Sequence, residues 1–121
     1  MRRKDREITE SDRIQKIIDA CQCMRIALAD GACAYIVPVN FGYDKAGKAF
    51  YFHGAAKGRK IDLIRQNGYA GFEMDTDHRL VTADEACGFS FEYSSIIGKG
   101  RITVVDDLEE KRHGLDCIME H

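Results

Sequence analysis

The sequence predicts a mainly β (α+β) protein, an antiparallel barrel or sandwich with helices packed on its outside. Six short segments alternate apolar with polar residues or form apolar runs between turn signals, as strands do. Most of these segments are joined by short turns such as Asp30-Gly31, which is typical of hairpins. The helix expected between the third and fourth strands is too short for a standard parallel crossover.

The elements of the first half follow in order along the chain. A helix is expected to start near Thr9 or Ser11, either of which can cap it. Its apolar side chains share one face at helical spacing: Ile14, Ile17, Ile18 and Cys21. Strands are then expected at residues 24–29, 34–41 and 49–53, with turns at 30–31 and 42–48. Because Pro38 lacks a backbone donor, the second strand should have a free edge or a bulge there.

The second half begins with a short helix that follows Lys60 and ends at Asn67-Gly68. Three more strands are expected at residues 69–75, 89–94 and 96–106, with a polar loop at 76–87. Asp107 and Glu110 resemble a capping box, which predicts a last helix over residues 108–120. Its apolar side chains share one face: Leu108, Leu115, Ile118 and Met119. Because the chain stops at His121 within this uncapped helix, we expect a further segment beyond it.

Composition bounds the class of protein. A chain of 121 residues with 45% hydrophobic and 31% charged residues suits one folded domain (residues 1–121) and excludes disorder. Its net charge of −2 provides no general attraction to nucleic acid or to an anionic membrane. The basic tail at residues 1–8 lacks the apolar core of a signal peptide, and no apolar run is long enough to span a membrane. The five cysteines are therefore interpreted as reduced thiols of a cytoplasmic protein.

The segment Gly54–Lys60 has the composition of an anion site. Its two glycines let backbone amides converge, and the helix start that follows adds amides without intrahelical partners. Lys57, Arg59 and Lys60 place three positive charges within four residues. This combination suits a phosphate, although it matches neither the Walker A nor the Rossmann pattern. A solvated basic turn that caps the helix is the alternative interpretation.

Three weaker features also suit a binding site. His53 directly precedes the cationic segment and can bond a phosphate or a ribose hydroxyl, although a lone histidine is more often structural. Pro38 shares a strand face with Ile36 and Asn40, where free backbone groups can bind a flat heterocycle or simply mark a protected edge. Ser94-Ser95 place hydroxyls beside a bend, as exposed strands often do. No metal site and no catalytic residue is predicted.

Five segments, taken together, carry a family resemblance: Ile36–Tyr43, Tyr51–Ala55, Gly58–Asp62, Phe72–Asp75 and Ser94–Arg101. They resemble the pyridoxamine-phosphate-oxidase-like flavin-binding split barrels, and more closely their 5-nitroimidazole resistance branch. The order and spacing of the segments carry the resemblance over roughly residues 2–120. It implies a six-stranded antiparallel split β-barrel with flanking helices. It also implies a homodimer with FMN, or alternatively FAD, in two clefts at the interface, and a C-terminal strand that this chain lacks.

Carried over by position, the resemblance also implies the cofactor-binding residues. Those lining the isoalloxazine would be Val37, Pro38, Val39 and Asn40. Those holding the phosphate and ribitol would be His53, Gly54, Ala55, Lys57, Gly58, Arg59 and Lys60. Those reaching across from the second subunit would be Ser94, Ser95, Ile96 and Ile97.

The implied function is a flavin-dependent oxidoreductase. Such a protein would take electrons from a donor such as NAD(P)H and reduce electron-poor small molecules, nitroimidazoles among them. One alternative is a flavin or haem binding protein without turnover, with His53, His78 and His113 as candidate axial ligands. Another is a general module for phosphate-bearing ligands such as pyridoxal phosphate, built on the cationic segment.

Overall fold

The computed structural model describes residues 3–88 and 90–121, and within them six strands and three α-helices. In chain order these are α1 (Ser11–Ala20), β1 (Met24–Asp30), β2 (Cys33–Val39), β3 (Gly42–Asp44), β4 (Ala49–Tyr51), α2 (Arg59–Asn67), β5 (Tyr69–Val81), β6 (Ser90–Arg101) and α3 (Leu108–Glu120). Short 3₁₀ turns cover Lys4–Arg6 and Ala86–Gly88. The predicted antiparallel architecture with flanking helices is confirmed.

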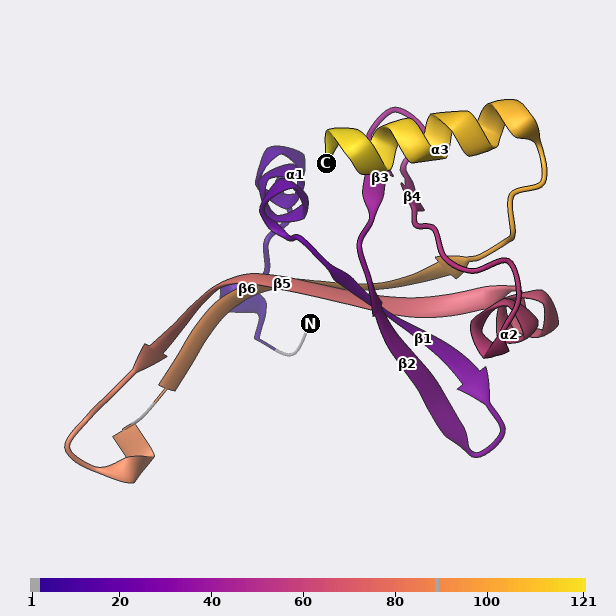
Figure 1. Cartoon of the computed structure of the whole chain (residues 1–121). Coiled ribbons are helices and arrows are strands. Elements are labelled where there is room, and N and C mark those ends of the chain that lie inside the picture. The colour runs from indigo at the N-terminus through magenta and orange to yellow at the C-terminus, as the bar shows by residue number, and fades with distance from the viewer. Residues whose placement is uncertain (1–2, 89) are drawn as a thin grey trace.

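The strands form two groups. β2, β1, β5 and β6 lie side by side in that order as one antiparallel sheet, and β3 pairs with β4 in a separate hairpin. Figure 1 shows α3 lying along the β3–β4 hairpin, with α2 beside the end of β1 and the start of β5. The far ends of β5 and β6 extend well away from the rest of the molecule as a two-stranded arm, which we define as residues 76–92. None of the helices in the described ranges has the length and apolar character needed to cross a bilayer.

One face of the four-stranded sheet carries the core, which we call the packed face. Alternate residues of β1, from Met24 to Leu28, point into it and are at most 3% exposed. Their neighbours in the core come from β2, β5, the helices and the strand-to-strand links: Ile17, Ile18, Cys21, Val39, Phe41, Leu63, Ile64 and Met74. α1 and α2 therefore cover the side of the sheet that the sequence pattern of β1 marks as apolar.

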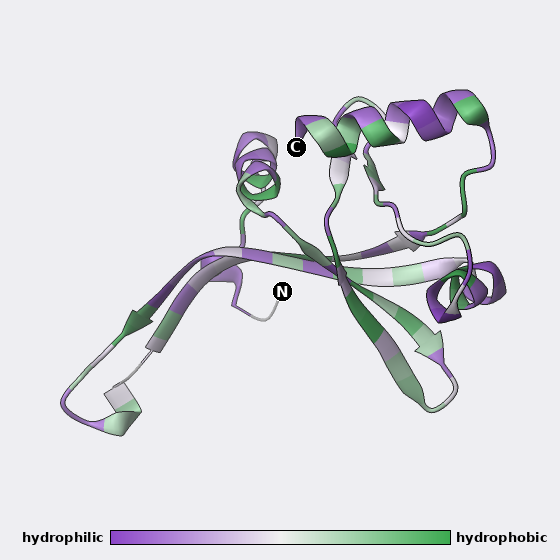
Figure 2. Cartoon of the chain, in the orientation of Figure 1, coloured by the Kyte–Doolittle hydropathy of each residue, from purple (hydrophilic) through white to green (hydrophobic). Residues whose placement is uncertain are grey.

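The opposite face, which we call the open face, is apolar but uncovered. A row of directly opposed residues crosses it from Pro38 through Arg25 and Glu73 to Ile97. Of the nine large apolar side chains exposed in the described part of the chain, six occupy this face: Ile36, Tyr69, Leu80, Phe91, Tyr93 and Ile97. Figure 2 shows hydrophobic residues reaching the end of β5 in the arm, where no helix covers them.

A β-bulge interrupts the pairing of β5 with β6. Thr76 opposes Ser94, but Arg79 opposes Glu92, so β5 contains one extra residue between these pairs. Asp77 has a left-handed backbone, with φ of 58°. Because the extra residue inverts the alternation of β5, Leu80 lies opposite Phe91 on the open face.

The second half corrects several predicted boundaries. Residues 76–81 of the predicted polar loop belong to β5, and the two strands predicted at 89–94 and 96–106 are the single strand β6, which ends at Arg101. Phe89, the expected start of the fifth strand, lies outside the described residues. β6 continues through Gly98, where a bend was predicted, because this glycine allows close packing instead. A Cβ there would lie 2.5 Å from the Phe72 ring.

Smaller corrections concern the first half. The predicted turn at 42–48 contains β3, β2 ends at Val39, and β4 ends at Tyr51, so His53 lies beyond its strand. α1 does start at Ser11, but its N-cap is Glu10, which makes no capping hydrogen bond through its side chain. The prediction that Pro38 lies on a strand with a free edge is confirmed, because β2 is the edge of its sheet.

α3 spans the predicted residues 108–120, and Asp107 caps it by accepting a hydrogen bond from the amide of Glu110 at 2.9 Å. Three of the side chains that share the predicted apolar face, Leu108, Leu115 and Met119, are exposed. The reason lies in a glycine contact. A Cβ at Gly42 would collide with the backbone of α3. The helix therefore packs through the side that faces Gly42 and not through its apolar side.

Candidate functional site

The cationic segment lies between the end of β4 and the start of α2. Gly58 is the N-cap of α2 and has φ of 134°, a conformation that favours glycine. No side chain caps the helix, so its first amides remain available as donors. His53, Ala55 and Lys57 are exposed along the approach to this helix start. The segment therefore has the donors and the charge that a phosphate requires.

Lys60 folds back over the start of the segment. Its Nζ lies 5.8 Å from the centre of the Phe52 ring, and a Cβ built on Gly54 would lie 3.0 Å from the same nitrogen. A larger residue at position 54 would therefore displace Lys60. The structure thus brings Gly54, Gly58 and Lys60, all predicted cofactor residues, to one end of α2.

Arg59 has a second role in the fold. Its guanidinium donates to the carboxylate of Asp30 at the tip of the β1–β2 hairpin. The side-chain amide of Asn67 reaches the same region and donates to the carbonyl of Ala29 at 2.8 Å. α2 is therefore fixed to the hairpin at both of its ends, which holds the cationic segment at a set position relative to β2.

The predicted isoalloxazine strip alternates between the two faces of the sheet. Pro38 and Asn40 are exposed on the side of the open face, whereas Val39 is only 8% exposed and Val37 is half-buried. Only Pro38 and Asn40 therefore present side chains to a ligand on the open face. Val37 and Val39 belong to the packed face.

The predicted second-subunit strip lies at the other edge of the sheet. Ser95 and Ile97 are exposed on the open face, and Ile97 is 79% exposed, whereas Ser94 and Ile96 are half-buried. Three strand spacings separate Pro38 from Ile97, or about 14 Å. Within one chain, the structure does not bring these two strips together.

A polar cluster between the two strips was missed by sequence reasoning. Arg25 donates from one nitrogen to Glu73 at 3.1 Å and to Asp75 at 2.9 Å, and the ring of His78 bonds Asp75. The imidazole also stacks on Phe91, with parallel planes and centroids 5.6 Å apart. The only sequence signal was that Arg25, Glu73 and Asp75 occupy alternate strand positions. The bulge that aims His78 has no such pattern.

The pKa values of the two carboxyl groups of the cluster shift in opposite directions. Partial burial, with the hydrogen bond and the charge of Asp75, raises the pKa of Glu73, against the opposing effect of Arg25. The same hydrogen bond lowers the pKa of Asp75, and His78 and Arg25 act in the same direction. Asp75, the member of the pair whose pKa is lowered, is the one that His78 contacts.

A second histidine–aspartate pair joins α3 to the β3–β4 hairpin. Nε2 of His113 lies 3.0 Å from the Asp44 carboxylate, and the Cys117 thiol lies 3.7 Å from the same nitrogen. The hydrogen bond with His113 lowers the pKa of Asp44. In the described ranges, no three His, Cys, Asp or Glu side chains are arranged to hold a metal ion.

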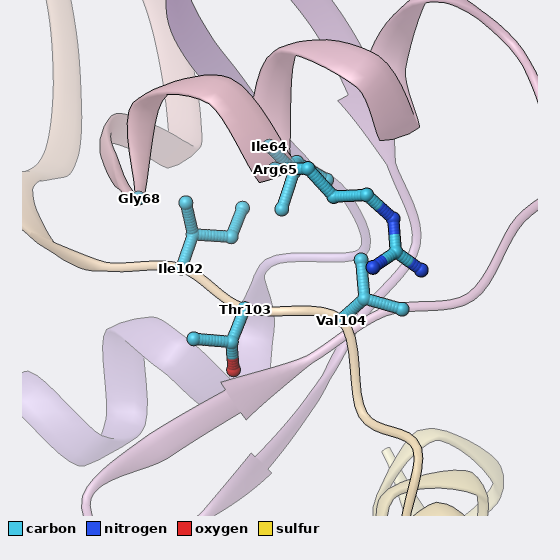
Figure 3. Close-up of a pocket in the computed structure, with 6 residues that line it drawn as sticks. All are labelled: Ile64, Arg65, Gly68, Ile102, Thr103 and Val104. Carbon is cyan, nitrogen blue, oxygen red and sulfur yellow. The ribbon is translucent and has the colours of Figure 1, made fainter.

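Two of the hollows in the described surface differ in size and position. The larger, about 360 Å³, lies between the end of α2 and residues 102–104. Figure 3 shows Ile102 pointing toward α2 and Thr103 pointing away from it. None of the predicted cofactor residues lines this hollow. The smaller, about 270 Å³, lies between the start of β1 and the bulge and is lined by Ala20, Gln22, Cys23, Arg25, Asp75, Thr76 and His78.

Comparison with known families matches residues 10–121 to the family described as pyridoxamine 5′-phosphate oxidase. Among solved structures, a candidate 5-nitroimidazole antibiotic resistance protein from Bacteroides thetaiotaomicron is 32% identical, with a TM-score of 0.80 over 94% of this chain. No curated protein matches the sequence.

More distant structures share the fold. The flavocytochrome Anf3 from Azotobacter vinelandii is 20% identical over 92% of this chain, with a TM-score of 0.78. An FAD and haem binding protein from Mycobacterium smegmatis is 22% identical over 93% of this chain, with a TM-score of 0.81. The chain spans 67% of the Bacteroides protein and only 50% and 54% of the other two. These likenesses agree with the predicted split-barrel fold.

Proposed function

Because the chain belongs to the pyridoxamine 5′-phosphate oxidase family, we propose that it is a flavin-dependent oxidoreductase. In this proposal it binds FMN and reduces nitroimidazole-like or other electron-poor small molecules, with NAD(P)H as the electron donor. The solved structure from Bacteroides, described as a candidate 5-nitroimidazole resistance protein, supports the substrate class. The bound flavin would supply the hydride equivalent, and the protein would supply binding and orientation.

The observation that carries the proposal is the convergence of charge and free amides at the start of α2. Lys57, Arg59 and Lys60 lie within two residues of Gly58, the N-cap of a helix that no side chain caps, and Gly54 leaves room for Lys60. A phosphate dianion would be held there by charge-assisted hydrogen bonds, each contributing about 1.5–3 kcal/mol. His53 and Ala55 would contact the ribitol from the exposed approach to this site.

The open face supports a homodimer. Six exposed apolar side chains on one sheet face form the kind of surface that a partner usually covers. A second copy seated on this face would bring its Ser94–Ile97 strip to the Pro38–Asn40 strip of the first. This pairing would supply both walls of the flavin site, which one chain holds about 14 Å apart.

The proposal is tested first by colour. The purified protein should show the visible absorption of a flavin, and the released chromophore should have the mass of FMN. The double variant Arg59→Ala/Lys60→Ala should retain less than about a tenth of the wild-type flavin, since it lacks two charge-assisted contacts. Lys111→Ala/Arg112→Ala, which removes two exposed charges from α3, is the matched control and should retain all of it.

Equal flavin retention by the double variant and its control would show that the phosphate site is wrong. Flavin that stays oxidised with NAD(P)H, or that is not reoxidised by a nitroimidazole, would contradict the reductase.

A second candidate is a flavin or haem binding protein without turnover. Of the structures that share the fold, one is described as binding FAD and haem and another as a flavocytochrome, and His53 is exposed beside the cationic segment. Titration with haemin distinguishes the two functions. A Soret band that is lost in His53→Ala would favour haem binding, and its absence would favour the reductase.

A further inference from the structure

The β-bulge in β5 places a histidine where the sheet faces solvent. The extra residue falls between Thr76 and Arg79, and Asp77 takes a left-handed backbone to accommodate it. Such a conformation is uncommon for a residue other than glycine, and bulges are over-represented beside active sites because they re-aim side chains. Here the side chain that is re-aimed is His78.

His78 is held in one orientation from two sides. Its Nε2 donates to the carboxylate of Asp75, and its ring stacks flat on Phe91. Asp75 is itself fixed by Arg25 at 2.9 Å. Within the described ranges, Nδ1 of His78 makes no hydrogen bond and is free to act on a ligand. An imidazole fixed by a carboxylate at one nitrogen is the arrangement that general acids use at the other.

The smaller hollow lies directly against this histidine. Its volume of about 270 Å³ is just below the range of sites for drug-sized ligands, so it suits a small planar ring. Its polar groups come from Gln22, Arg25, Thr76 and the carboxylate of Asp75, with His78 at one side. The mixed lining matches a small aromatic compound that carries a polar substituent.

The hollow also lies between the two predicted flavin strips. Arg25 directly opposes Pro38, and Asp75 and Thr76 directly oppose Ser95 and Ser94. A molecule in the hollow would therefore lie over β1 and β5, between the strip on β2 and the strip on β6. The larger hollow, beside α2 and residues 102–104, has no such relation to them.

We infer that the hollow beside the bulge is the binding site of the electron acceptor, and that His78, oriented by Asp75, gives the acceptor its proton. This inference rests on the proposed reductase function. Conversion of a nitro to a nitroso group consumes one hydride equivalent and one proton, breaks one N–O bond and releases water. The hydride equivalent comes from the reduced flavin. The Nδ1–H of protonated His78 provides the proton to the departing oxygen, and solvent restores it.

The charged and titratable groups around His78 are Glu73 and Asp75 of β5, Arg25 of β1, and Cys23 in the link that precedes β1. β6 contributes the Phe91 ring on the same side. The acceptor step therefore requires the protonated imidazole of His78 and should slow as the pH rises. The step in which NAD(P)H reduces the flavin has no such requirement.

The test separates the two half-reactions of the flavin-loaded protein by stopped flow. In His78→Gln, reoxidation of the reduced flavin by a 5-nitroimidazole should slow by about 10²–10⁴-fold and lose its pH dependence. Flavin content and the rate of reduction by NAD(P)H should remain within about twofold of wild type. His113→Gln removes the other histidine that pairs with an aspartate and should change none of these values.

A second variant and a binding measurement complete the test. Asp75→Asn keeps the imidazole but loosens its orientation, so reoxidation should slow by about tenfold. In NMR spectra of the oxidised, flavin-loaded protein, adding the 5-nitroimidazole should shift the ring signals of His78 and not those of His113. A wild-type rate of flavin reoxidation in His78→Gln, or His78 signals that do not shift, would overturn this inference but not the proposed function. A wild-type protein without flavin, or one that NAD(P)H does not reduce, would overturn the proposed function as well.

Discussion

The two faces of the four-stranded sheet are built from the same strands but differ in what covers them. On the packed face, Met24, Ile26 and Leu28 lie under the helices and are almost inaccessible. On the open face, Ile36 and Ile97 are 65% and 79% exposed. An apolar side chain stabilises a folded or associated state only when its surface is removed from water, by roughly 25 cal/mol for each Å² that is buried. The packed face therefore holds the chain folded, and the open face has the composition of a surface for association and binding.

The largest expected effect is on the packed face. Leu28→Ala should lower the free energy of unfolding by about 2–5 kcal/mol, because Leu28 is 1% exposed and its removal leaves a cavity. Ile36→Ala, one strand away on the open face, is the matched control and should cost under about 0.5 kcal/mol in dilute protein. Urea denaturation at low concentration measures both. Similar losses in the two variants would contradict the distinction between the faces.

A charge on the open face should act on association rather than folding. Ile97→Lys should weaken self-association by about 100-fold, or about 2.7 kcal/mol, because it would bury an ammonium group in the proposed interface. Its unfolding should remain near wild type, since the side chain is exposed. Leu108→Lys, at an exposed apolar position of α3, should leave association unchanged. Sedimentation over a concentration series measures the association constant of each variant. Weaker association of the Leu108 variant instead would place the interface at α3.

Adding a Cβ to a glycine on each face compares how closely the two faces are packed. Gly98→Ala should cost about 1–3 kcal/mol, because its Cβ would press into the Phe72 ring on the packed face. Gly71→Ala adds a Cβ on the open face, where the nearest atom is a carbonyl oxygen 3.7 Å away, so it should be close to neutral. Thermal unfolding measures both variants. A neutral Gly98→Ala would mean that Phe72 moves freely.

The smallest expected effect is the change that Glu73 causes in the free energy of unfolding as the pH varies. Its pKa is raised in the folded state, so its contribution to stability is present below its ordinary value and is lost as the pH rises through the folded value. Glu73→Gln keeps a donor for Asp75 without the charge. The variant should therefore match wild type near pH 4 and exceed its stability at pH 7 by less than about 1 kcal/mol. A less stable variant at pH 7 would show that the Arg25 contact outweighs the carboxyl pair.

The elements that local residues specify were predictable. The helix cap at Asp107, the ending of α2 at Gly68 and the apolar alternation of β1 each depend on neighbours in sequence, and each is found where predicted. The cationic segment was visible for the same reason, because its charges and glycines are contiguous. The resemblance supplied the split-barrel family, which local patterns alone left open between a barrel and a sandwich.

The features that sequence reasoning missed depend on long-range pairing. A polar run at residues 76–81 reads as a loop unless its partner strand is known, and the bulge is defined only by the register between β5 and β6. The contact of α3 with Gly42 joins residues about 75 positions apart, and it decides which side of the helix is exposed. For the candidate site, the sequence identified the strips but not the cluster of Arg25, Asp75 and His78 between them.

The bulge also limits how the length of the arm can change over evolution. Because side chains alternate along a strand, deleting one residue near Asp77 would turn Leu80 to the reverse side of the ribbon. Deleting or inserting two residues would restore the original facing of everything beyond the change. Viable insertions and deletions in this hairpin should therefore occur in pairs of residues. Homologues without the bulge should carry their apolar side chains at shifted positions.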